Sequence, residues 1–207
     1  AVVPPGIAKH IPQETFSPQW RAIVKTFLER VEADVFDDLV AVNLAEFLKT
    51  RRAEILALIG RAEQLALSLQ ARSLDYILCH SDIHAGNILI DVNDTLYIVD
   101  WDDPIYAPKE RDLMFVGGGL GGGGHTPQGE ETLFYQGYGQ TQIDPTALAY
   151  YRYERIIQDI AVFCERIFLT YEGREDREQS FRYLKSIFLP NNVLEIAYKS
   201  DKTLRNV

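Results

Sequence analysis

The sequence predicts an α+β fold that is mainly helical and carries a small β-hairpin near its middle. Two observations lead to this prediction. Apolar residues recur at helical spacing over long stretches at both ends of the chain, whereas three short apolar runs separated by polar residues lie between residues 74 and 100. The length of 207 residues, with 46% hydrophobic and 25% charged residues, allows one globular domain with a substantial core.

Two helices are expected in the N-terminal part. Ser17 and Pro18 match an N-cap followed by proline at the first helical position, and the apolar spacing continues to about residue 33. A second helical stretch covers residues 37–71, with a break expected near Thr50.

Short strands are expected next, at the apolar runs YILC (76–79), NILI (87–90) and LYIVD (96–100). The polar segment DVND joins the last two, which predicts a β-hairpin. The glycine-rich stretch 117–124 lacks the Lys-Ser/Thr of a P-loop, so we interpret it as a mobile loop or lid.

The C-terminal part is expected to be helical again. Asp144 and Pro145 repeat the cap-and-proline signal at the start of a helix that reaches about residue 171. Two shorter helices are expected at residues 174–188 and 191–204.

Composition excludes several classes of protein. The net charge of −9 argues against a nucleic-acid surface and fits a cationic small-molecule substrate, bound metal or simple solubility. No apolar run is long enough to cross a bilayer. The two cysteines, Cys79 and Cys164, have no partner at CxxC spacing, so we expect reduced thiols in a cytoplasmic protein that contacts no membrane.

The segment HSDIHAGN (80–87) holds the most informative polar residues. His80, Asp82 and His84 alternate, and on a continuous strand they would form one face that could bind a transition metal. Gly86 and Asn87 favour a turn instead, and further metal ligands are lacking nearby. The metal-clamp interpretation is therefore weakly supported.

Phosphoryl transfer explains the same segment better. It needs a carboxylate to orient the attacking hydroxyl and oxygen ligands to hold Mg²⁺ on the nucleotide phosphates. Asp82 and Asn87 have the spacing of the aspartate and asparagine in the kinase pattern H-R-D-x-x-x-x-N, and Asp100 follows at the end of the hairpin. The hairpin would return Asp100 to the loop that carries the other two.

The segments HSDIHAGNILI, IVDWDDP and RDLMF resemble the aminoglycoside phosphotransferase and choline kinase family, which has a protein-kinase-like fold. The pattern is matched with Ser81 in place of glycine, most strongly over residues 76–116. FSPQWR, APKERDLMFVGGG and FYQGYG further resemble its spectinomycin phosphotransferase branch.

By that resemblance Asp82 is the catalytic base, and Asn87 and Asp100 are ligands of the Mg²⁺ that accompanies ATP or GTP. His84 occupies the position of a phosphate-contacting lysine, with loop packing as an equal alternative. Asp112 resembles the buried acid that braces this loop in the family. His80 is interpreted as a buried brace of the loop backbone rather than a metal ligand.

The acceptor is expected to be a small, cationic molecule. The APKE segment follows Asp100 too closely to leave room for an activation segment or a peptide platform. Asp102 and Asp103 could bind metal or substrate, or belong to a solvated turn. An aminoglycoside or aminocyclitol is favoured; choline, homoserine or an amino sugar are alternatives, as is a non-catalytic, pseudokinase-like binding module.

The resemblance implies that residues 1–207 form the C-terminal lobe of such an enzyme. The Gly-rich loop and strand lysine of the nucleotide-binding N-terminal lobe have no match before residue 20, so residues 1–16 are expected to be a linker from that lobe. The N-terminal lobe of the same protein would then be a partner, and the 207-residue piece alone is expected to be inactive.

Overall fold

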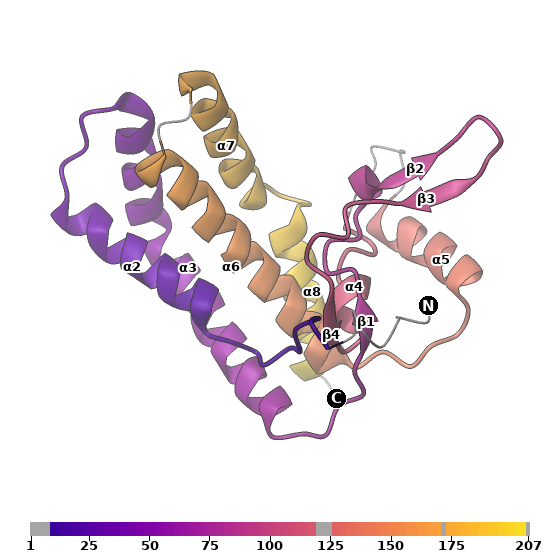
Figure 1. The fold of residues 1–207 in the computed structure, drawn as a ribbon. Coiled ribbons are helices and arrows are strands. Elements are labelled where there is room, and N and C mark those ends of the chain that lie inside the picture. Colours follow the sequence, from indigo (N-terminus) through magenta and orange to yellow (C-terminus); the bar gives the residue numbers. More distant parts are fainter. Residues whose placement is uncertain (1–8, 119–125, 171–172, 206–207) are drawn as a thin grey trace.

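A bundle of long helices forms one part of the fold, and short strands and helices gather beside it (Figure 1). The computed structural model describes residues 9–118, 126–170 and 173–205. The long helices are α2 (Gln19–Ala33), α3 (Leu39–Gln70), α6 (Pro145–Leu169), α7 (Arg174–Ile187) and α8 (Val193–Arg205). The mainly helical prediction is thus confirmed.

Helices α2 and α3 follow the predicted apolar pattern with two differences. Helix α2 begins one residue later than expected, at Gln19, whose amide donates to the Ser17 hydroxyl at 3.3 Å. The break expected near Thr50 is wrong, because α3 continues through it and the Thr50 hydroxyl donates to the Glu46 carbonyl of the same helix at 2.9 Å. A threonine can remain inside a helix when its hydroxyl is satisfied in this way.

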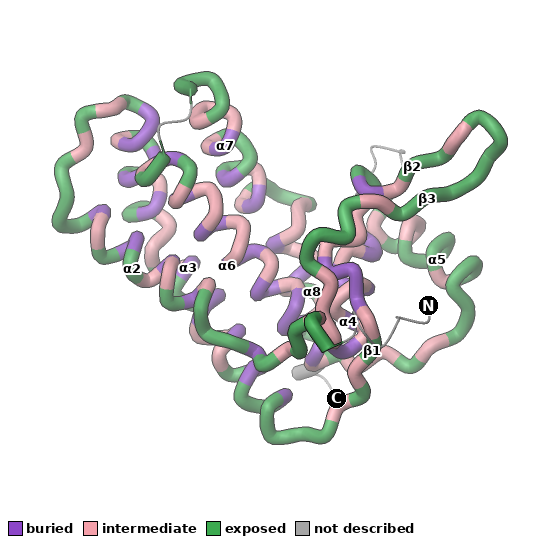
Figure 2. The backbone as a smooth tube through the Cα atoms, in the orientation of Figure 1, coloured by how far each residue is buried: buried purple, intermediate pink, exposed green. Residues whose placement is uncertain are grey.

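Helix α6 is the centre of the bundle and contacts α2, α3, α7 and α8. Its start matches the predicted cap, since the Asp144 carboxylate accepts hydrogen bonds from the amides of Thr146 and Ala147. Figure 2 shows buried positions concentrated along α6 and its neighbours. Its largest fully buried side chains include Tyr150, Tyr151 and Tyr153, so these tyrosines belong to the core.

The strands form two separate antiparallel pairs. Strand β2 (Ile88–Ile90) pairs with β3 (Leu96–Ile98) in the predicted hairpin, which projects away from the bundle (Figure 1). Strand β1 (Ile77–Cys79) pairs with β4 (Ile105–Ala107), a strand that the sequence analysis did not predict. The apolar run that follows the Asp-Asp-Pro turn has only three residues, which is too short to indicate a strand.

Two helices near the strands were also not predicted: α4 (Glu110–Leu113) and α5 (Pro127–Tyr138). Helix α5 has no buried residue, which explains why its apolar periodicity is weak. The glycine-rich stretch expected to be a mobile loop lies outside the described residues, except for Gly117 and Gly118.

Part of the expected linker packs on the domain. The Tyr106 amide donates to the Pro12 carbonyl at 2.9 Å, and the Glu14 amide donates to the Tyr106 carbonyl at 2.8 Å. Phe16 is buried against Tyr150. Residues 1–8 of that linker lie outside the described part. No described helix is both long enough and apolar enough to cross a membrane.

A charged pair lies inside the bundle. Arg21 on α2 has its Nε 3.3 Å from Oε2 of Glu154 on α6, and both side chains are almost completely buried. The Arg21 guanidinium also donates to the carbonyls of Phe16 and Ser17. Burial raises the pKa of Glu154 to about 7, although the Arg21 charge opposes the rise.

Glu154 should therefore make the stability of the protein depend on pH. The protonated acid tolerates burial, so its contribution is complete below the ordinary pKa of 4.5 and is lost as the pH rises through about 7. We expect this group to lower the free energy of unfolding by on the order of 3 kcal/mol across that range. Denaturant unfolding of Glu154→Gln should show a flatter pH dependence than the wild type, and an unchanged slope would contradict the assignment.

Candidate active site

The segment 80–87 forms a loop, here called the catalytic loop, between β1 and β2. Asp112 on α4 holds its first residues, because its carboxylate accepts the backbone amides of His80 at 2.9 Å and of Ser81 at 2.7 Å. Burial raises the pKa of Asp112, although these two hydrogen bonds act in the opposite direction. This geometry supports the bracing role expected for Asp112.

Removing that carboxylate should loosen the catalytic loop. In Asp112→Ala the amides of His80 and Ser81 lose their acceptor, which should cost about 2–3 kcal/mol of unfolding free energy. Hydrogen exchange at these two amides should accelerate more than exchange in α3. Equal protection of the two amides in the variant and the wild type would show that Asp112 does not hold the loop.

His80 uses both ring nitrogens within the protein. Its Nε2 lies 2.8 Å from the Val99 carbonyl, and its Nδ1 accepts the Asp82 amide at 3.3 Å. The ring also lies against Trp101, with centroids 4.5 Å apart. A neutral ring with the proton on Nε2 satisfies both bonds. This supports a brace rather than a metal ligand, and the described residues contain no cluster of three or more His, Cys, Asp or Glu side chains that could hold a metal.

Ser81 has a left-handed backbone, with φ of 72°. That conformation explains why the family pattern has glycine at this position, since glycine adopts it without strain. Here the serine hydroxyl donates to the Asp103 carbonyl at 2.7 Å and so ties the catalytic loop to the turn before β4.

Two variants of Ser81 should separate strain from hydrogen bonding. Both Ser81→Ala and Ser81→Gly lose the bond to Asp103, but only alanine keeps a Cβ in the left-handed region. We expect the glycine variant to be more stable than the alanine variant by about 1 kcal/mol. Thermal denaturation measures the difference, and equal stabilities would mean that φ is not strained at this position.

Hydrogen bonds tie Asn87 to the catalytic loop and to the strand end that precedes Asp100. The Asn87 side chain donates through Nδ2 to the Asp82 carbonyl at 3.0 Å, a bond that does not use its amide oxygen. The Val99 amide donates to the Asn87 carbonyl at 3.0 Å, so Asp100 follows directly beside the loop. Asp100 is exposed and also left-handed, with φ of 66°.

An amide oxygen and a carboxylate are hard oxygen ligands, and Mg²⁺ prefers such ligands. The donor set of Asn87 and Asp100 therefore fits a magnesium ion that keeps its remaining positions for water and phosphate oxygens.

His84 lies beside the carboxylate of Asp82, with its Nε2 3.6 Å from Oδ2. Its other nitrogen accepts the Gly86 amide at 3.0 Å, which fixes the ring. A Cβ on residue 86 would lie 2.8 Å from the His84 ring, so glycine is required for this approach. His84 therefore both packs in the loop and points an imidazole nitrogen towards the Asp82 carboxylate.

Asp102 and Asp103 are exposed in the turn before β4. Asp103 contributes its backbone carbonyl to Ser81, not its carboxylate. This geometry favours the solvated-turn interpretation of the pair over a substrate-binding one.

Arg155 is the site residue that the sequence analysis missed. Its Nη1 lies 2.5 Å from Oδ1 of Asp82, and its Nε lies 3.0 Å from Oδ1 of Asp159. The guanidinium also lies over the Phe115 ring, 5.4 Å from its centroid. The i,i+4 spacing of Arg155 and Asp159 was a visible signal of an ion pair, but nothing in the sequence linked that pair to Asp82.

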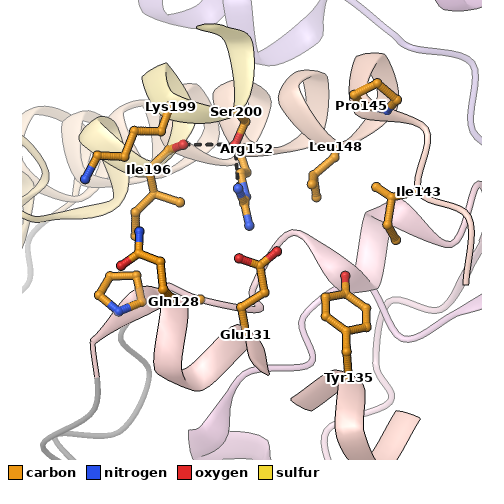
Figure 3. A pocket seen from close by; sticks show the side chains of 12 residues that line it. Gln128, Glu131, Tyr135, Ile143, Pro145, Leu148, Arg152, Ile196, Lys199 and Ser200 are labelled. Carbon is orange, nitrogen blue, oxygen red and sulfur yellow. Dashed lines mark hydrogen bonds between the residues drawn. The ribbon is translucent and has the colours of Figure 1, made fainter. Parts of the chain in front are cut away.

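Two neighbouring cavities share Arg152 and Ile196 in their walls, and one of them reaches the catalytic loop. The smaller, of about 210 Å³, is lined by residues that include His84, Phe115, Arg155 and Asp159. The larger, of about 360 Å³, lies between α5, α6 and α8. Figure 3 shows Glu131 and Tyr135 facing it from α5, opposite Arg152, which also lines the smaller cavity.

The chain resembles solved structures of one enzyme over most of its length. A search of curated proteins gives no match. The chain is similar to the crystal structure of spectinomycin phosphotransferase APH(9)-Ia in complex with ADP and spectinomycin, with 43% identity, a TM-score of 0.85 and coverage of 97% of this chain and 60% of that one. The AMP-bound complex of the same enzyme gives 44% identity, a TM-score of 0.83 and coverage of 95% and 60%.

This chain therefore spans about 60% of the length of those enzymes and shares their kinase-like fold over that part. The model of the phosphotransferase enzyme family matches residues 9–151, which include the whole catalytic loop, the hairpin and Asp112. On this evidence, the chain belongs to the phosphotransferase enzyme family.

Proposed function

We propose that the protein containing this chain transfers the γ-phosphate of a nucleotide to a hydroxyl of a small molecule. The observation that carries the proposal is the arrangement of Asp82, Asn87 and Asp100, which one loop and one hairpin hold together. The likeness to a spectinomycin phosphotransferase over 97% of the chain supports the same reaction.

Asp82 is proposed as the catalytic base. Its carboxylate orients the acceptor hydroxyl and takes up the proton as that oxygen attacks the phosphorus. His84 is proposed to contact the transferring phosphoryl group, and its position 3.6 Å from Oδ2 supports this role. Asn87 and Asp100 would hold Mg²⁺, which when bound neutralises charge on the nucleotide phosphates.

The favoured nucleotide is ATP, with GTP as the alternative. ADP and AMP are bound in the solved relatives, which supports a purine nucleotide as the donor. In the proposed arrangement, residues 1–207 supply the catalytic loop, and an N-terminal lobe of the same protein covers the nucleotide. The protein is proposed to act in the cytoplasm, where Mg²⁺ and ATP are abundant.

The favoured acceptor is an aminocyclitol antibiotic such as spectinomycin, which would make the protein an antibiotic-resistance enzyme. The proposal rests on the likeness to an enzyme solved with that compound. Choline, homoserine and an amino sugar are the competing acceptors of the same reaction class.

The test uses the full-length protein that contains this chain, with Mg²⁺ and ATP. Spectinomycin, choline, homoserine and an amino sugar are supplied separately, and ADP release and the mass of the acceptor are followed. We expect ADP release to depend on spectinomycin and the antibiotic to gain one phosphate. Phosphorylation of another acceptor alone would replace the proposed substrate, and no acceptor-dependent ADP with any of them would favour a non-catalytic binding module.

A further inference from the structure

The ion pair between Asp82 and Arg155 is the feature of the site that the phosphotransfer roles leave unexplained. A catalytic base needs a free lone pair for the acceptor hydroxyl. Nη1 of Arg155 lies 2.5 Å from Oδ1 of Asp82, whereas Oδ2 of Asp82 lies 3.6 Å from Nε2 of His84. His84 and Arg155, the two residues that contact the Asp82 carboxylate, both line the smaller cavity, and Oδ2 is the oxygen that Arg155 does not bond.

Arg155 itself is held rigidly. Its Nε bonds Asp159 at 3.0 Å one turn along α6, and its guanidinium lies over Phe115. Burial opposes the charge of Arg155, but the carboxylates of Asp159 and Asp82 outweigh burial and raise its pKa. A guanidinium held on two sides fixes the carboxylate that it contacts, since its planar donors have a defined direction.

The same arrangement sets the charge of the cavity. Arg152 and Arg155 both line it, and Asp159 is its only lining carboxylate among the described residues. The Arg152 guanidinium is held by hydrogen bonds to the carbonyls of Met114 and Val116. The two guanidinium charges are balanced by the carboxylates of Asp82 and Asp159, so a molecule with many ammonium groups would find no surplus of negative charge there.

We propose that Arg155 is a positioning and specificity-determining residue of this site. It holds the Asp82 carboxylate through Oδ1 so that Oδ2 faces the acceptor hydroxyl, and its charge selects a compact acceptor with few ammonium groups over a polycation. The inference rests on the proposed function, and it narrows the acceptor class from cationic small molecules in general to hydroxyl-rich molecules of low charge.

The test compares variants of the full-length protein with Mg²⁺ and ATP. In Arg155→Gln we expect kcat for spectinomycin to fall by about 10- to 100-fold, with a smaller change in KM, because the base is misplaced rather than the acceptor lost. Arg155→Lys should retain part of kcat. Guanidinium ion, added well below denaturing concentrations, should restore part of the kcat of Arg155→Ala, which a purely structural role would not allow.

The same variants test selectivity. The preference of Arg155→Gln for spectinomycin over an aminoglycoside with several ammonium groups, measured as the ratio of kcat/KM values, should fall by about tenfold or more. Arg61→Gln is the matched control, since it breaks an Arg–Asp pair with Asp201 that lies outside the site and should lower stability but leave kcat and selectivity unchanged.

Failure of the inference and failure of the proposed function are distinguishable. If the wild type phosphorylates spectinomycin and Asp82→Asn does not, but Arg155→Gln behaves like Arg61→Gln, only the role of Arg155 is overturned. If the wild type phosphorylates none of the acceptors, the proposed function fails, and the inference fails with it.

Discussion

Replacing Asp82 by asparagine in the full-length protein is expected to lower kcat by about 10²–10⁴-fold, the usual contribution of a general base. The amide cannot accept the proton of the acceptor hydroxyl. The loop itself should remain in place, because it is held through the Asp82 carbonyl, which accepts from the Asn87 side chain, and through Asp112. Unfolding free energy should change by about 1 kcal/mol or less, since the ion pair with Arg155 is partly exposed.

Asp94→Asn provides the matched control for this result. Asp94 is exposed in the hairpin turn and has φ of 59°, a conformation that asparagine also adopts readily. Steady-state assays should give the wild-type kcat for this variant. Comparable kcat values for Asp82→Asn and Asp94→Asn would show that Asp82 is not the catalytic base.

The second large effect is expected from Asp100→Asn. Asparagine tolerates the left-handed φ of 66° at this position, so the change removes a negative charge without straining the backbone. Loss of a carboxylate ligand should lower kcat by on the order of 10²–10³-fold at ordinary Mg²⁺ concentrations, as for other groups that stabilise transition-state charge. The Mg²⁺ concentration for half-maximal rate should rise.

A titration of activity against Mg²⁺ measures both quantities. Asp94→Asn again serves as the control for removal of an exposed carboxylate near the hairpin. If Asp100→Asn has the wild-type Mg²⁺ dependence, Asp100 is not a ligand of the ion, whatever happens to kcat.

Much of this fold follows from local signals in the sequence. The cap at Asp144 indicates where α6 begins, and the apolar spacing of the long helices indicates which faces α3 and α6 bury. The short run "IYA" of β4 carried no such signal, because its pairing with β1 is decided by contacts across the chain. Helix α5 was missed for the related reason that it buries none of its residues.

Some residues of the candidate site could likewise be predicted from the sequence, whereas one could not. Asp82 and Asn87 lie close in sequence, and the hairpin returns Asp100 to them, so their grouping could be predicted. Arg155 lies on a helix more than seventy residues further along, and only the packing of α6 against the catalytic loop brings it to Asp82. Its contribution to the charge of the cavity therefore required a structure.

The central claim is that Asp82, Asn87 and Asp100 form one phosphoryl-transfer centre. A rapid-quench experiment on the full-length protein with Mg²⁺, γ-labelled ATP and spectinomycin tests it most directly. We expect the wild type to place the label on the acceptor within a single turnover, and Asp82→Asn to bind the nucleotide but transfer no label on that timescale. Transfer of the label by Asp82→Asn at the wild-type rate, or its release as free phosphate with no labelled acceptor, would show that the three residues do not form such a centre.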